Sequence, residues 1–271
     1  MTTFQKILRY FAIAFAVFLS VSIIGAIFGA VGLFGDLFDE GAVLADLTSY
    51  PVSAEIRNLE IVINAADLRI TEGETFSIES NLKHLKVEER GNTLLVTETR
   101  KLTGAYNGAV LTISVPAGTE FGKVDLTAGA GKVTIANLSA EAIDFELGAG
   151  EVNITSMTAT GKAEIDGGAG QITISGGALR NFELGMGVGQ LNLTSALTGD
   201  CQMDLGIGAS NITLIGSKED YKLEVSKGIG TLSVDGQNVN DYGSSGNGTN
   251  KVEINGGIGE INVLFKEDVK K

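Results

Sequence analysis

Acidic side chains recur at one position of a motif that the sequence repeats seven times. The motif is eight residues long and ends in Gly-X-Gly, and its final glycines are residues 131, 150, 170, 189, 208, 230 and 259. Six residues before the final glycine, every copy except the fifth, which has Gln202, places an acid: Asp125, Asp144, Glu164, Glu183, Glu224 and Glu253. Like charges about 4 Å apart repel by about 1 kcal/mol even in water. A stacked column of this kind could therefore bind a divalent metal or a cationic partner.

Lysines beside these acids offer a simpler explanation for the column. Two residues before the acid, four copies carry a lysine: Lys123, Lys162, Lys222 and Lys251. Positions two apart on a strand lie on the same face, so these lysines largely neutralise the acids. We interpret most of this face as a solvated surface that compensates its own charge. The lysine-poor middle retains the candidate residues for binding a cation or a partner: Asp144, Glu146, Glu164, Asp166, Glu183 and Asp204.

The Gly-X-Gly motif itself suggests phosphate or calcium chemistry, but the residues around it argue against both. A dinucleotide-binding turn needs a third glycine and a following helix, whereas here the glycines lead into a strand, as in GAGEVNIT (148–155). The calcium-binding nonapeptide repeat needs an aspartate two residues beyond its last glycine, where this sequence has mostly apolar residues. A P-loop is absent. We therefore predict no cofactor and no metal site at the glycines.

The remaining reactive residue types do not form a catalytic cluster in the sequence. His84 is the single histidine, and Cys201 falls in an apolar column of the repeat, which predicts a small core residue. Carboxylate pairs suited to glycoside hydrolysis are present, but on regular strand faces, and there is no tryptophan to stack on a sugar. We predict that the protein is not an enzyme and assign no catalytic residue.

A polar column occupies the third position after each final glycine. Its members are Thr134, Asn153, Thr173, Asn192, Asn211, Ser233 and Asn262. Such a ladder could bind sugar hydroxyls, and stacking of polar side chains between neighbouring strands explains it equally well. The sequence leaves both interpretations open.

The elements that position these columns are predicted from the period of the repeat. The final glycines are 19, 20, 19, 19, 22 and 29 residues apart, and apolar residues alternate on both sides of them, as in Val124 and Leu126 or Val133 and Ile135. A fixed period of this size is typical of a solenoid in which each repeat buries its apolar face against its neighbours. Identical columns predict parallel, in-register pairing of successive coils, with the glycines at the corners. The predicted fold is all-β, a parallel β-helix-like solenoid with coils of about 19–20 residues.

The register divides the chain beyond residue 52 into three parts. Residues 122–265 form the regular repeat, and 266–271 are a charged C-terminal tail. The register also extends backwards, with Ala66 in the place of a final glycine and Leu59, Ile61, Leu68 and Ile70 in the apolar columns. We therefore expect 53–121 to form irregular early coils or a cap of the same solenoid. The polar, glycine-rich insertion between Asp235 and Asn250 predicts a mobile surface loop.

A single hydrophobic segment precedes the solenoid. Residues 11–35 carry no charge and would form a helix roughly 37 Å long, enough to cross a hydrocarbon core of about 30 Å. This length favours an uncleaved transmembrane helix over a signal peptide, although small residues around 26–30 keep cleavage as the alternative. Lys6 and Arg9 before the span predict a cytoplasmic N-terminus (1–10). A juxtamembrane connector (36–52) and an extracytoplasmic C-terminal domain then follow in a single-pass membrane protein.

Composition excludes one class of partner. The net charge of −13 leaves no basic patch for nucleic acid. One cysteine cannot form an intramolecular disulfide, so cysteine content gives no information on the redox compartment.

The stretch LTISVPAGTEFGKVDLTAGAGKVTIANL (111–138), followed by GAGEVNIT and GAGQITIS, resembles a bacterial "putative adhesin" family of uncharacterised function. The resemblance covers about residues 53–265. It implies an N-terminal anchor or short leader before a glycine-punctuated β-solenoid, and it brings no catalytic residues with it. The chain is more distantly similar to the C-terminal domains of membrane proteins that modulate cell-wall stress signalling.

Two main functional hypotheses follow from these observations. The first is a membrane-anchored protein of the bacterial cell envelope that displays a non-catalytic extracellular β-solenoid for binding, adhesion or scaffolding. Its partner would be a protein or an envelope glycan. The alternative is a regulatory membrane subunit in envelope-stress signalling. A polysaccharide-active enzyme is the third and weakest hypothesis, and the sequence leaves the oligomeric state open.

Overall fold

The computed structural model describes residues 44–53, 55–99, 108–240, 242–245 and 248–267, and these are almost entirely β-strand. They include one 3-10 helix, η1 (Lys218–Asp220). The strands are β1 (Leu44–Pro51), β2 (Asn58–Ala65), β3 (Asp67–Gly73), β4 (Ser77–Leu82), β5 (Leu85–Arg90), β6 (Thr93–Glu98), β7 (Val110–Pro116), β8 (Phe121–Ile174), β9 (Gly177–Arg180), β10 (Phe182–Thr198), β11 (Asp200–Ile215), β12 (Tyr221–Ser226), β13 (Ile229–Val234), β14 (Gln237–Val239), β15 (Tyr242–Ser245) and β16 (Asn250–Lys266).

The hydrophobic segment 11–35 and the flanking residues 1–10, on which the predicted topology depends, lie outside the described residues. Within the described part of the chain, no helix has the length and apolar character needed to cross a bilayer.

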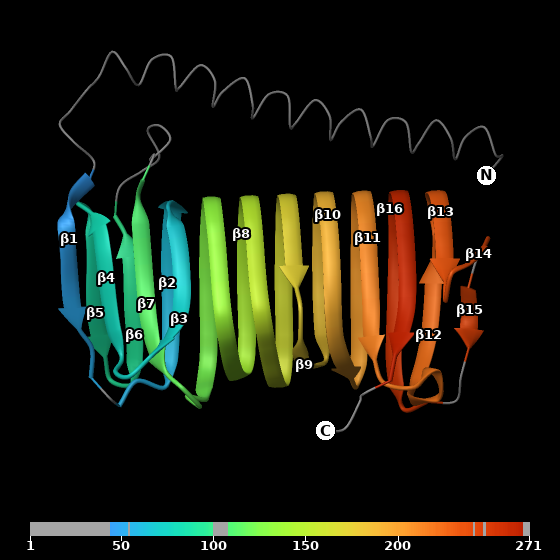
Figure 1. The fold of residues 1–271 in the computed structure, drawn as a ribbon, viewed down its shortest axis with the longest axis horizontal. Coiled ribbons are helices and arrows are strands. Elements are labelled where there is room, and N and C mark those ends of the chain that lie inside the picture. Colours follow the sequence, from blue (N-terminus) through green and yellow to red (C-terminus); the bar gives the residue numbers. More distant parts are fainter. Residues whose placement is uncertain (1–43, 54, 100–107, 241, 246–247, 268–271) are drawn as a thin grey trace, which may run out of the picture. The chain divides into compact units, whose positions relative to one another are not determined.

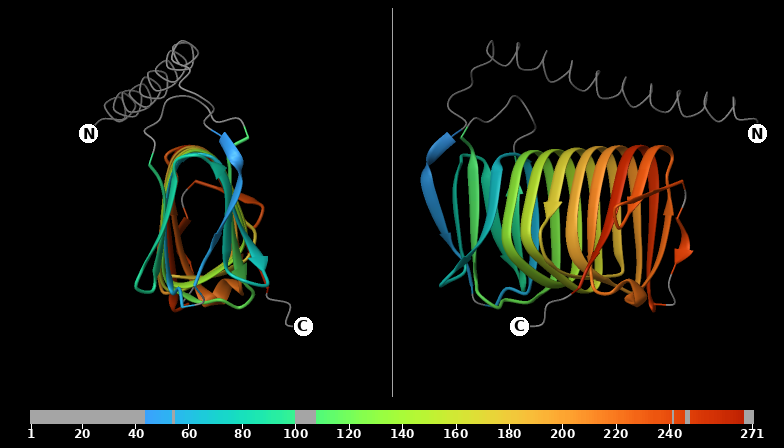
Figure 2. Two further views of the ribbon diagram at one scale, coloured as in Figure 1. Left: turned by 90° about the vertical axis from the view of Figure 1, so that its left-hand side faces the viewer. Right: turned by 45° about the vertical axis from the view of Figure 1, so that its right-hand side comes forward.

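The strands wind into a stack of coils, which confirms the predicted all-β, solenoid-like fold (Figure 1). Figure 2 shows the same coils along the axis of the stack, where they superpose as a flattened ring. In the middle of the stack, neighbouring coils pair in parallel with identical columns aligned. Leu191 lies opposite Ile172 on one side and opposite Ser210 on the other. Because strand residues alternate in direction, one set of columns fills the core and the other faces solvent.

The final glycines of the regular repeat form corners where a side chain would clash with the neighbouring coil. Gly189 and Gly208 have φ values of +146° and +148°, a region that L residues with side chains rarely adopt. A Cβ atom on Gly189 would lie 1.8 Å from the carbonyl oxygen of Gly170 on the neighbouring coil. The repeated glycine therefore serves both the turn of the backbone and the close stacking of the coils.

The backward extension of the register to residues 59–70 is confirmed. β2 pairs in parallel with the start of β8, so that Leu59 lies opposite Val124 and Ile61 opposite Leu126. β3 continues the same coil and places Leu68 opposite Val133 and Ile70 opposite Ile135. All of these apolar side chains are buried.

At the C-terminal end, the order of the coils in space differs from their order in the sequence. The last coil, β16, lies between β11 on one side and β12 and β13 on the other (Figure 1). Gly259 is accordingly paired with both Gly208 and Gly230. The prediction that successive coils stack in sequence order is therefore wrong for the last two. The longer distance in sequence between their final glycines supplies the reason. The additional residues allow the chain to leave β11, form the outer coil of β12 and β13 first, and then return to form β16 between them.

The predicted surface loop between Asp235 and Asn250 is also corrected. Part of it forms the short strands β14 and β15, which pair antiparallel with β13 and β12. These strands cover the outermost coil, so the insertion closes the C-terminal end of the stack.

The N-terminal end has a comparable arrangement. β6 and β7 pair in parallel with the outer side of β2 and β3, although they follow them in the sequence. β5 and β4 then pair antiparallel with β6 and β7, and β1 pairs antiparallel with β4 at the edge. β1 comprises residues 44–51 and thus part of the segment that the sequence describes as a juxtamembrane connector.

Candidate functional site

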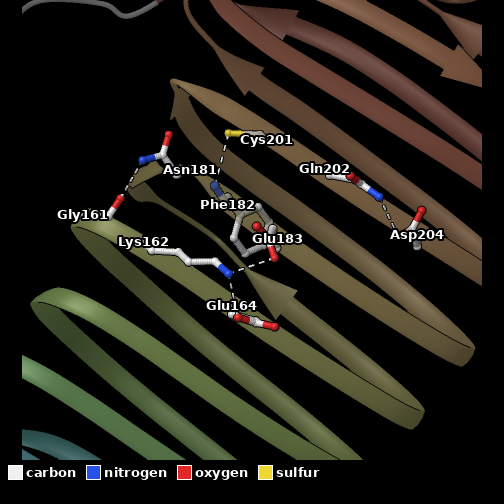
Figure 3. Close-up of polar contacts among 9 residues, drawn as sticks. All are labelled: Gly161, Lys162, Glu164, Asn181, Phe182, Glu183, Cys201, Gln202 and Asp204. Atoms are coloured by element: carbon white, nitrogen blue, oxygen red, sulfur yellow. Dashed lines mark hydrogen bonds and ion pairs between the residues drawn. The ribbon is translucent and has the colours of Figure 1, made fainter.

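The acidic column lies on the outside of the coils, where one lysine neutralises two of its members. Glu183 on β10 lies opposite Glu164 on β8. Lys162 Nζ is 2.9 Å from a carboxylate oxygen of Glu164 and 3.0 Å from one of Glu183, and so bridges two coils (Figure 3). Hydrogen bonds to these two carboxylates raise the pKa of Lys162 to about 12. These two acids are therefore occupied by a cation that the protein itself supplies.

The same compensation recurs towards both ends of the stack. Lys123 pairs with Asp125 at 2.7 Å, and the pKa of the lysine is raised first by this bond and further by the nearby Asp144. Lys251 pairs with Glu253 at 3.1 Å, which raises the lysine pKa and lowers that of the carboxyl. The paired side chains are about one third to one half exposed, so each pair contributes little to stability.

Asp204 is compensated by amide donors instead of lysines. The amide of Gln202 donates to one carboxylate oxygen at 2.9 Å, as Figure 3 shows, and the amide of Asn255 donates to the other at 3.0 Å. Sequence reasoning missed both donors. Gln202 was visible as the exception in the acidic column, whereas Asn255 becomes a neighbour only because β16 lies beside β11.

Glu146 and Asp166 are two further predicted acids without such partners, and Asp144 has only the nearby charge of Lys123. The first two lie on neighbouring coils, because Gly148 stacks on Gly168, and they line an open groove of about 520 Å³ whose floor is formed largely by glycines. Among the described residues, neither carboxylate makes a hydrogen bond or ion pair. Two adjacent carboxylates give this acidic groove a negative potential that attracts cationic groups.

The structure does not bring the six predicted acids together into one site. It places Glu164 and Glu183 in one ion-paired cluster, Glu146 and Asp166 in the acidic groove, Asp144 near Lys123, and Asp204 among amides. Within the described ranges, no group of three or more histidine, cysteine or acidic side chains is arranged to hold a metal ion.

The polar column forms a hydrogen-bonded ladder along the stack. The Asn192 amide donates to the Thr173 hydroxyl at 3.4 Å, Asn211 donates to Asn192 at 3.0 Å, and Asn262 donates to Asn211 at 3.1 Å. We call these four residues the amide ladder. Side chains two residues earlier on the same strands support it, since Gln171 donates to Thr173 and Gln190 donates to Asn192.

The single cysteine is a core residue, as predicted. Cys201 is 3% exposed and accepts a hydrogen bond from the Phe182 N–H at 3.4 Å (Figure 3). Burial raises the pKa of its thiol, which disfavours the reactive thiolate. His84 is exposed on the turn between β4 and β5.

Glu98 is a buried carboxylate that sequence reasoning missed. It is 5% exposed, and one of its oxygens accepts the backbone N–H groups of Asn64, at 2.7 Å, and Ala65, at 3.4 Å. The pairing between β2 and β6 ends at Val62 and Thr97, so the next amides of β2 have no strand partner on the β6 side. Glu98 satisfies these amides and thereby has a structural role. It lies outside the glycine register, which offered no signal for it.

Comparison with known proteins gives one family and several solved structures. The family described as Toastrack DUF4097 matches residues 56–264. A cell adhesion protein from Clostridium sporogenes, described as putative, is 15% identical with a TM-score of 0.39, over 82% of this chain and 99% of its own. A putative adhesin from Bacteroides fragilis is 14% identical with a TM-score of 0.39, over 80% of this chain and 95% of its own. A putative adhesin from Parabacteroides distasonis is 12% identical with a TM-score of 0.42, over 82% of this chain and 98% of its own. No curated protein matches the sequence.

Proposed function

Because the chain belongs to the Toastrack DUF4097 family, we propose that it is a non-catalytic binding protein whose β-solenoid is displayed outside the membrane of the bacterial cell envelope. The family match confirms the predicted resemblance to a glycine-punctuated β-solenoid family of uncharacterised function. Binding, adhesion or scaffolding would then be the use of its outer faces.

The observation that carries this proposal is the regular outer surface of the middle coils. Side chains of one kind repeat on neighbouring strands, as ion pairs around Lys162 and as amides from Asn192 to Asn262. Strands lie about 4.8 Å apart, so each face presents one chemistry at a short, fixed interval. Such a surface suits an extended or repetitive partner better than a single small substrate.

The proposed anchoring rests on the sequence of the N-terminal segment. Residues 11–35 are long and apolar enough to span a bilayer, and Lys6 and Arg9 lie on the side that the positive-inside tendency assigns to the cytoplasm. The solenoid, which begins after this segment, would then lie on the opposite side of the membrane.

Two epitope tags on the full-length chain test this topology. We expect a tag after Lys271 to be removed when intact cells are treated with protease, and a tag before Met1 to be protected until the cells are lysed. The N-terminal tag is the matched control for membrane integrity. A C-terminal tag that stays protected in intact cells would contradict display outside the membrane.

Deletion of residues 1–35 separates the binding protein from the regulatory membrane subunit. A binding protein keeps its affinity for surface components after the deletion, because the solenoid carries its binding faces. A regulatory subunit that signals through its membrane helix loses its effect on envelope-stress responses. Retained binding together with an unchanged stress response in the deletion strain favours the binding protein.

A further inference from the structure

The outward face that carries the amide ladder is uncharged across three neighbouring coils, although the protein has a net charge of −13. We call this surface the neutral face and define it by Gln171, Thr173, Gln190, Asn192, Asn211 and Thr213, which the strand register places side by side. Charged residues border it in the same columns, with Glu151 on one side, paired with Lys132 at 3.2 Å, and Glu260 on the other.

The neutral face has hydrogen-bond donors that the ladder does not use. A side-chain amide carries two N–H groups. In the described residues, Asn192 uses its amide nitrogen for one bond, to Thr173, and Asn211 uses its own for one bond, to Asn192. Each therefore retains one N–H, and both residues lie on an exposed or half-exposed part of the sheet.

The ladder also fixes the orientation of these donors before any ligand arrives. Asn192 accepts from Asn211 at 3.0 Å and from Gln190 at 3.3 Å, while Asn211 accepts from Asn262 at 3.1 Å. Ordering a free polar side chain on binding costs conformational entropy. Here that entropy is lost during folding, so the free N–H groups form a preorganised row along the solenoid.

We propose that the neutral face binds an uncharged, extended β-1,4-linked polysaccharide that runs parallel to the solenoid axis, with successive sugars over successive coils. The inference rests on the proposed binding function and names its ligand class. A β-1,4-linked chain advances by roughly one strand spacing per sugar, so successive sugars can lie over successive coils about 4.8 Å apart, each with hydroxyl groups at the edge of the ribbon. The net charge of −13 repels anionic polymers but leaves an uncharged polymer unaffected.

Binding of the full-length, detergent-solubilised protein to chitin beads and to soluble chitohexaose tests the proposal. We expect wild-type protein to bind both probes with an affinity that is independent of salt. The double variant Asn192→Ala/Asn211→Ala removes both free donors and should bind chitohexaose at least tenfold more weakly. The matched control is Glu164→Gln/Glu183→Gln, which alters the acidic column on the same coils and should leave the affinity unchanged.

A second variant guards against loss of folding in the double alanine protein. Thr194 lies opposite Thr213 on the neighbouring coil, so Thr194→Lys retains every ladder bond and places a bulky cation beside the neutral face. Loss of binding by this variant, at an unchanged melting temperature, supports the proposal. Failure of folded wild-type protein to bind either probe overturns it, and so does binding that survives both the double alanine substitution and Thr194→Lys. Loss of binding confined to the glutamine control also overturns it and places the ligand on the acidic face.

The two proposals fail in different experiments. A surface-accessible C-terminal tag without chitin binding rejects the polysaccharide and leaves the displayed solenoid intact. A protected tag rejects the display, whatever the purified protein binds.

Discussion

The middle of the solenoid and its two ends follow different rules. In the middle, each coil pairs with the coils before and after it in the sequence, and the final glycines of the repeat stack on one another at one corner. At each end, the coil nearest the chain terminus lies second from the outside, and the outermost coil is covered by antiparallel strands. An open parallel edge would invite pairing with other chains. The comparison shows that the repeat packs the core, whereas irregular segments cover the strand edges that the repeat would leave exposed.

Substitution of a corner glycine tests the rule of the middle and should have the largest effect. In Gly189→Ala, the new Cβ would lie 1.8 Å from the Gly170 carbonyl oxygen at a φ of +146°. We expect the free energy of unfolding to fall by more than about 4 kcal/mol, in the range of exceptional single substitutions. Urea unfolding followed by circular dichroism measures it. Gly185→Ala is the control, because its Cβ meets only the movable Asp166 carboxylate and should cost below about 1 kcal/mol. Similar losses in both variants would contradict a special role for the corners.

Removal of Glu98 tests the N-terminal end, where a side chain replaces a neighbouring strand. Glu98→Ala leaves the buried amides of Asn64 and Ala65 without their acceptor, which should cost about 1–3 kcal/mol. Hydrogen exchange at these two amides should accelerate beyond the change in global stability. Glu88→Ala, which removes exposed pairs on β5, is the matched acidic control and should leave exchange at residues 64 and 65 unchanged.

Lys162→Met tests whether charge compensation holds the middle coils together. The variant leaves Glu164 opposite Glu183, and because Lys162 is 48% exposed we expect a loss below about 1 kcal/mol that shrinks as salt is added. The folded pKa of Lys162, about 12, lies above its ordinary value of 10.5. Its contribution is therefore complete below pH 10.5 and is lost as the pH rises through about 12. Lys222→Met, at a position that faces Lys251, should be neutral or slightly stabilising at low salt.

Ser210→Val tests a small irregularity of the middle coils, a polar residue in an apolar core column. Ser210 is 6% exposed in a column where its neighbours are Leu191 and Ile261, and it borders a small cavity of about 20 Å³. We expect a gain of about 1 kcal/mol from apolar filling. Ser233→Val, on the outward side of β13, is the control and should give no gain. A destabilised Ser210→Val protein would indicate that the hydroxyl is needed where it lies.

The sequence predicted the register of the paired strands better than the order of the coils in the stack, for a physical reason. Apolar columns and corner glycines determine which residues face each other, because a slip by one residue would turn the core outward. They carry no information on which coil is the neighbour, since all coils share the same columns and are interchangeable in pairing. The exchange of the last two coils was signalled only by their spacing of 22 and 29 residues.

The candidate site was predicted only in part, and the reason is related. The lysine column correctly indicated compensation, but the sequence shows only neighbours within one coil. Lys162 reaches the next coil and neutralises Glu183, which the sequence assigned to the lysine-poor middle. Glu98 and Asn255 could not be recognised at all, because their partners depend on how the ends of the chain fold back.

The interchangeable coils have a consequence for the evolution of length. Both caps close on coils that present the same columns as every coil in between, so a duplication of 19 residues in the middle would insert one complete level and disturb neither cap. Each such duplication would lengthen the stack by about 4.8 Å. Gene duplication can therefore change the length of the solenoid in steps of one coil, and related chains of different length should differ by multiples of one coil.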